Sequence, residues 1–197
     1  MRIPDAAHRS RPWLIHDLVP DFTLEDVWAL PTPGGPGDFP RLVEVFAAFD
    51  PSAGGRGAAR ALFALRGWLG ARLGWDTPDA GLGARVPTLR ERLPAELRGA
   101  AREPGFGAGP FVPLYRRGDE FAAEIANRTV HAVLHLGWVA ADAGGHRGEL
   151  AVYAKPNGRL GTAYLAAIRP FRHAIVYPAM LRQIGRAWAS RAERETA

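Results

Sequence analysis

The sequence predicts an α+β domain in which a long C-terminal helix grips an antiparallel sheet. Strand-like segments separated by turns run from residue 111 to residue 155, and helix-like segments precede them. Residues 155–188 are long, apolar on one side and helical in composition. A helix and a sheet must bury their apolar faces against each other, and a long helix closing over a sheet leaves a cavity between the two layers. We therefore expect a small-molecule pocket between them.

The first 50 residues predict one strand and two helices. Residues 13–18 read as a short first strand, and residues 23–30 as a short helix capped by Asp21 or Thr23, with acidic residues in its first turn. Asp38 precedes a second helix, because Pro40 suits a first turn and the next apolar residues follow helical spacing.

The next segment predicts one longer helix and then irregular chain. Residues 57–74 carry leucines along one helical stripe. Residues 76–110 are rich in Gly, Pro and Arg, so we expect an irregular run with one or two helical turns at residues 89–97.

The second half of the chain predicts a meander. Residues 112–117 and 120–127 suggest a hairpin around Gly118-Asp119, although the Ala-rich second arm could equally be a short helix capped by Asp119. Residues 129–139 form a strand pattern, Asp142-Ala143-Gly144-Gly145 a turn, and residues 147–155 the return strand.

The C-terminal region predicts an interrupted helix. Asn157-Gly158 opens it, and we expect a break at Pro170 and a kink or second break at Pro178, because proline removes a helical hydrogen bond. One strand, helices, an antiparallel meander and a long helix is the order of a helix-grip fold. We expect one such domain over residues 13–190, with flexible tails at residues 1–12 and 191–197.

Composition excludes several classes of function. The chain has 197 residues and no cysteine, which rules out disulfides and thiol chemistry and fits a cytoplasmic protein. The first residues carry no apolar leader pattern and no run is long and apolar enough to span a membrane, so we expect neither a secretory signal nor a membrane span. The formal charge is +5, but the arginines are scattered beside acidic residues, which argues against nucleic-acid binding. We expect no cofactor and no metal ion. The sequence is compatible with a homodimer.

The strand predicted at residues 129–139 carries two candidate functional histidines. His131 and His135 share one face but lie about 13 Å apart, too far to bind one metal ion. A regular hairpin register pairs His131 with Lys155 and His135 with Ala151, which adds Glu149 and Tyr153 to the same polar face. That face is either a solvent-exposed surface or a wet pocket wall, with His135 as a general acid or base.

The remaining candidates have both structural and functional interpretations. The catalytic candidates are His135, His131, Tyr153 and Glu124, although Glu124 could instead pair with Arg128. Asn127 fits a turn, because asparagine tolerates left-handed backbone. His173 shares a helix face with Arg169 and Tyr177. The candidates for lining the ligand site are Trp28, Tyr115, Asn127, Trp138, Tyr164, His173, Tyr177 and Met180.

Several motifs carry a resemblance to a known family. They are K-P-x-G-x-x-G-x-x-Y from Lys155, the following P-F-x-H and Y-P-x-M, the block E-I-A-N-R-T-V-H-A-V-L-H-L-G-W, and W-A-L-P-T-P-G-G near the N-terminus. Over residues 13–188 the chain resembles the bacterial family catalogued as domain of unknown function 2867. The resemblance implies the superfamily of START domains, birch-pollen-allergen-like proteins and polyketide cyclases (SRPBCC), and hence a START-like helix-grip fold.

Some relatives in that family follow an NAD(P)-binding domain. The run G-G-P-G in this chain lacks the G-x-G-x-x-G spacing, so NAD(P) binding does not carry over. The prolines around it also remove backbone donors that a phosphate loop needs, which favours a structural turn.

Two functions from different classes fit these observations. The first is binding of a small hydrophobic or aromatic molecule between the sheet and the C-terminal helix, which the many aromatic residues favour. The alternative is a cofactor-independent cyclase or isomerase that moves protons on a polyketide-like substrate. An interaction protein that docks a partner through residues 76–110 is a third hypothesis.

Overall fold

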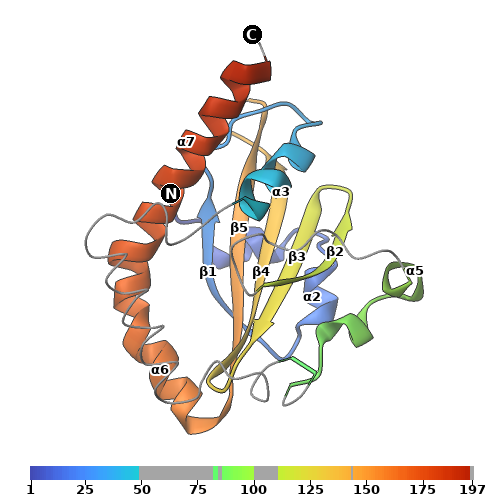
Figure 1. The fold of residues 1–197 in the computed structure, drawn as a ribbon, viewed down its shortest axis with the longest axis vertical. Coiled ribbons are helices and arrows are strands. Elements are labelled where there is room, and N and C mark those ends of the chain that lie inside the picture. Colours follow the sequence, from blue (N-terminus) through green and yellow to red (C-terminus); the bar gives the residue numbers. More distant parts are fainter. Residues whose placement is uncertain (49–81, 84–85, 100–110, 143, 196–197) are drawn as a thin grey trace.

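A five-stranded antiparallel sheet forms the centre of the computed structural model, which describes residues 1–48, 82–83, 86–99, 111–142 and 144–195. The strand order is β1-β5-β4-β3-β2, so the first strand lies beside the last (Figure 1). The strands are β1 Thr23–Ala29, β2 Val112–Arg117, β3 Glu120–Ala126, β4 Val130–Ala140 and β5 His146–Pro156.

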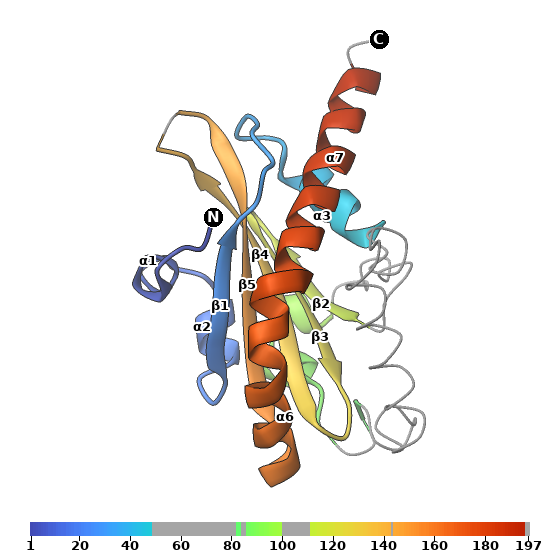
Figure 2. The same ribbon diagram turned by 90° about the vertical axis from the view of Figure 1, so that its left-hand side faces the viewer.

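Helices cover both faces of this sheet. They are α1 Asp5–Arg9, α2 Ile15–Leu18, α3 Phe39–Ala47, the 3₁₀ turn η2 Leu89–Arg92, α5 Ala95–Arg98, α6 Gly158–Phe171, the π-helical segment η3 Arg172–Val176 and α7 Tyr177–Glu195. Figure 2 shows α1 and α2 on one side of the sheet and α3 on the other. The helix predicted at residues 57–74 lies outside the described residues.

The predicted meander is confirmed. Residues 120–126 are strand β3, so the helical alternative for this arm is wrong. In the β4–β5 hairpin His131 pairs with Lys155 and His135 with Ala151, as the regular register predicts. The α3 helix after Asp38 and the turns at residues 89–98 are also confirmed.

The two elements predicted before residue 30 are wrong. Residues 15–18 form helix α2 rather than a strand, and residues 23–29 form strand β1 rather than a helix. The register of β1 against β5 shifts between Leu24 and Asp26. This bulge puts Leu24 and Val27 on the same face although they are three residues apart, which imitates helical spacing. Pairing with β5 then decides the conformation.

Both ends of the chain differ from the flexible tails expected for them. Ile3 donates its backbone N–H to Val27 O at 2.9 Å, and Arg2 forms an isolated antiparallel β-bridge with Trp28. His8, in α1, is fully buried. At the other end α7 continues to Glu195.

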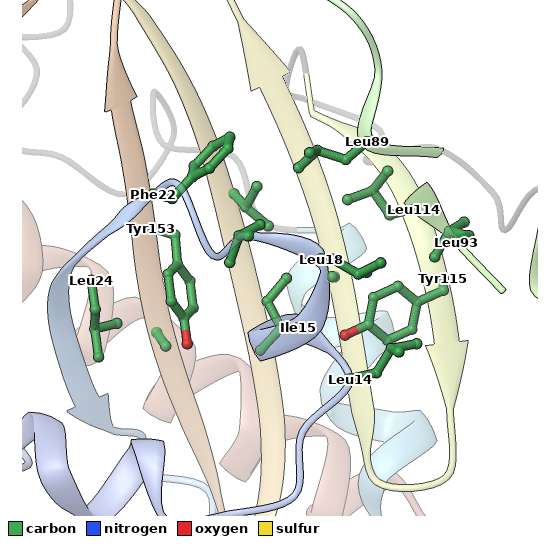
Figure 3. Close-up of a cluster of buried hydrophobic side chains, with 14 of the residues drawn as sticks. Leu14, Ile15, Leu18, Phe22, Leu24, Leu89, Leu93, Leu114, Tyr115 and Tyr153 are labelled. Atoms are coloured by element: carbon green, nitrogen blue, oxygen red, sulfur yellow. The ribbon is translucent and has the colours of Figure 1, made fainter. Parts of the chain in front are cut away.

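Each face of the sheet has its own core. On the first face, the segment from Leu14 to Phe22 and residues 89–93 pack against side chains such as Tyr115 and Tyr153. Figure 3 shows Ile15 and Leu18 lying across the strands between these two tyrosines, with Leu14 beside Tyr115. On the second face, α3 and α7 pack against Phe121, Leu136 and Trp138. The polar face predicted on β4 and β5 is the first face, and the N-terminal segment covers it.

The C-terminal helical region is continuous from Gly158 to Glu195, so the break predicted at Pro170 is wrong. Pro170 lies inside α6, and Pro178 is the second residue of α7. The π-helical turn η3 lies between the two prolines, where the missing backbone N–H groups interrupt regular bonding. No helix within the described ranges is long and apolar enough to cross a bilayer.

Candidate functional site

A pocket of about 300 Å³ opens on the first face of the sheet, away from α7. Three parts of the chain form its wall: Phe22 before β1, residues 86–92 around η2, and the ends of the central strands. The strands supply His131 from β4 and Lys155 from β5, and Asn157 follows β5. The wall of the pocket therefore combines four apolar residues with six polar or charged ones.

A buried carboxylate holds the histidine of this pocket. Glu124 is fully buried, and its Oε2 accepts a hydrogen bond from His131 Nε2 at 2.8 Å and from the Leu89 N–H at 3.1 Å. The Thr88 hydroxyl donates to Oε1. Glu124 therefore bonds His131 and the η2 segment rather than pairing with Arg128.

The His131 ring is fixed on its other side as well. The Phe22 ring packs against it edge to face, with centroids 5.0 Å apart. Among the described residues His131 Nδ1 has no hydrogen-bond partner, so this nitrogen is available to the pocket. An oriented imidazole with one free nitrogen can exchange a proton or a hydrogen bond with a bound molecule.

Three charged side chains meet at the rim. Arg92 Nη1 donates to Asp21 Oδ1 at 2.5 Å, and Lys155 Nζ donates to Asp21 Oδ2 at 2.7 Å. Arg92 also donates to Leu18 O at 2.9 Å. The Arg92 hydrogen bond, more than any other interaction, holds the pKa of Asp21 well below its usual range, so this carboxylate stays ionised.

Tyr153 belongs to a polar cluster beneath the N-terminal segment. Its hydroxyl lies 2.9 Å from His8 Nε2 and 3.2 Å from His16 Nδ1. His8 Nδ1 lies 2.6 Å from Glu149 Oε1, and both groups are buried. Burial raises the pKa of Tyr153. Tyr153 therefore ties α1 to the sheet and does not line the pocket.

His135 lies in the same buried layer. Its Nε2 is 3.2 Å from Glu120 Oε2, which also accepts the Tyr115 hydroxyl at 3.0 Å, while the Trp13 ring packs 5.3 Å from the imidazole. Burial lowers the pKa of His135 to about 4. Burial would raise the pKa of Glu120, but hydrogen bonds from His135, Leu14 and Tyr115 lower it. His135 is a neutral buried donor and is not part of the pocket wall.

The C-terminal helix brings other predicted residues to β1. Asp26 is fully buried on the second face. It accepts hydrogen bonds from His173 Nε2 at 2.6 Å and the Tyr177 hydroxyl at 2.8 Å, and Arg172 lies 3.1 Å away. The Trp28 ring packs against both His173 and Tyr177. These residues anchor η3 and α7 to the edge strand.

The remaining candidates are dispersed. Trp138 packs against Trp188 and donates to Gly35 O, and Met180 packs on the same core. Tyr164 is half-buried on α6. Asn127 forms a turn as predicted, but side-chain hydrogen bonds and not a left-handed backbone stabilise it. Its Oδ1 accepts from the Thr129 and Val130 backbones, and its own φ is negative.

The sequence did not indicate several residues of the pocket and of the buried hydrogen-bond networks. Thr88 and Arg92 lie in the irregular Gly- and Pro-rich run, where no periodicity marks them. Asp21 and Asp26 resemble the cap and the first-turn acids of a helix, because the sequence predicts a helix at residues 23–30, where β1 lies. Glu120 did carry a signal, since pairing β3 with β4 places it with the candidate Glu124 on the face of His131 and His135.

No group of three or more His, Asp or Glu side chains in the described ranges is arranged to hold a metal ion. Comparison with curated proteins and with solved structures gave no match. A family model matches residues 18–179, most of the chain, and confirms the family to which the motifs pointed. The chain therefore belongs to the family described as Protein of unknown function (DUF2867).

Proposed function

We propose that the protein binds a small molecule with an aromatic or apolar body in the pocket beside His131. The pair of Glu124 and His131 carries this proposal. A buried carboxylate is costly to desolvate, and here it orients an imidazole whose second nitrogen is free at a pocket wall. The pocket volume of about 300 Å³ is at the lower end of the range for small-molecule sites.

The proposed ligand site lies on the opposite face from the one that we expected. Side chains of α3 and α7 pack on the face that the C-terminal helix covers, and His173 and Tyr177 are engaged by Asp26 there. The pocket beside His131 combines a cavity with polar side chains on its wall. We therefore place the ligand between the sheet and the segment at residues 86–92.

We also propose the finer classification, a START-like helix-grip fold within the SRPBCC superfamily. Two features support it: the first strand lies beside the last, and a long helix follows the final strand and packs along the sheet. A fold of this kind does not determine which molecule is bound, so the function is argued from the pocket.

Filling the pocket provides the test. Val86 lines it, so Val86→Trp places an indole in the proposed ligand volume. Val112→Trp is the matched control, because Val112 is 39% exposed at the edge strand β2. Native mass spectrometry of freshly purified protein should show a retained small molecule in the wild type and in Val112→Trp, and a reduced amount in Val86→Trp. Equal retention in all three would place the ligand elsewhere.

A cofactor-independent isomerase or cyclase is the second candidate, and the Glu124–His131 pair favours it. His131 Nδ1 would take a proton from an acidic carbon of the substrate and return it to another atom, while Glu124 positions the ring. In D₂O this exchange would replace the C–H hydrogen of an aromatic 1,3-diketone by deuterium. NMR would monitor the loss of that hydrogen signal. His131→Gln should abolish catalysed exchange and His146→Gln should not. Exchange that survives His131→Gln would remove this candidate.

A further inference from the structure

We infer that the ligand carries a carboxylate, which takes the place of Asp21 between Arg92 and Lys155. This inference rests on the proposed function, because it names the chemical class of the molecule in the same pocket. Both cations line the pocket, and one carboxylate from the loop between α2 and β1 bridges them.

The geometry around Asp21 is that of a carboxylate site. Arg92 reaches both oxygens, with Nη1–Oδ1 at 2.5 Å and Nη2–Oδ2 at 3.2 Å. Lys155 adds a third donor to Oδ2 at 2.7 Å. A guanidinium fork matches the planar, two-oxygen shape of a carboxylate, so the same three donors fit a carboxylate from a ligand.

Asp21 can be displaced because the ion pairs are exposed. The side chains of Arg92, Asp21 and Lys155 are 42%, 36% and 47% exposed. Ion pairs of this kind contribute little to stability, so an incoming anion exchanges one weak interaction for a similar one and adds its apolar contacts. Arg92 also donates to Leu18 O, which holds the guanidinium in place when Asp21 leaves.

The position of the two cations sets the orientation of the ligand. Lys155 pairs with His131 across the β4–β5 ladder, so a carboxylate on Lys155 lies beside the imidazole. The apolar body then points toward Phe22 and Leu89. Glu91 is an acid on this wall, and its charge opposes the anion.

Benzoate and benzamide are the probes, because they share a ring and differ in charge. Backbone amide NMR of His131, Leu89 and Lys155 follows their binding. We expect benzoate to shift the NMR signals of these amides. We expect the affinity for benzamide to be lower by a factor of at least about five. Lys155→Gln should weaken benzoate about three- to tenfold, Asp21→Asn should strengthen it, and Glu91→Gln should strengthen it less. Arg117→Gln, an exposed cation on β2, is the matched control.

The outcomes separate this inference from the proposed function. Equal binding of benzamide, or weaker benzoate binding in Asp21→Asn, overturns the carboxylate while leaving a small-molecule pocket. Inorganic phosphate that shifts the same amides when benzoate does not would also overturn it. Failure of both probes and of a set of neutral aromatic fragments to shift any pocket amide would overturn the inference and the proposed function together.

Discussion

His131 Nε2 lies 2.8 Å from Glu124 Oε2, and the two side chains are 4% and 0% exposed. Glu124 also accepts hydrogen bonds from Thr88 and Leu89, so it connects the central strand β4 to the segment at residues 88–89. The same carboxylate therefore shapes the pocket wall and orients its histidine.

Glu124→Gln should destabilise the fold. The amide keeps the shape of the side chain but has one acceptor oxygen for three donors, so at least one buried donor loses its partner. We expect a loss of about 1–3 kcal/mol in the free energy of unfolding, measured with urea. Glu44→Gln is the control, because Glu44 pairs with Arg191 on the surface at 66% exposure. A change below about 0.5 kcal/mol in Glu124→Gln would contradict the buried network.

A close backbone contact sets the start of α6. A Cβ on Gly161 would overlap Thr129 O, so Gly161→Ala must push α6 away from the turn before β4. We expect a loss of at least about 2 kcal/mol, measured as a lower Tm. Gly37→Ala is the matched control, since no atom lies within 4 Å of its added Cβ. Equal melting of the two variants would show that α6 does not pack on this turn.

The covered sheet face should make the protein sensitive to acid. Burial lowers the pKa of His135 to about 4 from 6.5, so the folded state holds this histidine neutral. That stability is present above pH 6.5 and is lost as the pH falls toward 4. The lowered pKa of Glu120 acts in the same direction.

The free energy of unfolding should fall between pH 7 and pH 4 by an amount on the order of 3 kcal/mol from His135 alone. Urea titrations at several pH values measure it. His135→Gln should flatten the profile over this window and should also lower stability at pH 7. A wild-type profile that His135→Gln leaves unchanged would show that other groups control acid unfolding.

Asp26 should control how firmly the C-terminal helix is attached. Asp26→Asn keeps the shape but removes the charge that holds His173, Tyr177 and Arg172. Hydrogen exchange should speed up at residues 172–177, while the amides of β4 stay protected. Unchanged protection in η3 would mean that apolar packing alone holds this helix.

The β4–β5 hairpin was predictable because its determinants are local. Alternating side chains and the Asp142-Ala143-Gly144-Gly145 turn specify one register, which placed His131 opposite Lys155. The β1 strand was not predictable in the same way. Its bulge between Leu24 and Asp26 gives helical apolar spacing, and only the pairing with β5 resolves it.

The environment of the histidines depended on segments far away in the chain. Alternation showed that His131 and His135 share a face, but nothing local shows that Leu14 and Leu89 cover that face. That covering leaves a pocket beside His131 and closes over His135. It arises from contacts between segments that are far apart in the sequence, which no short motif encodes.

Amide NMR with a mixture of small aromatic fragments is the sharpest test of ligand binding beside His131, because it locates binding on the chain. We predict that shifts concentrate at Thr88, His131 and Lys155, and that Val86→Trp removes them while Val112→Trp does not. Shifts that cluster along α7 and the opposite face of the sheet, with these three amides unmoved, would contradict it.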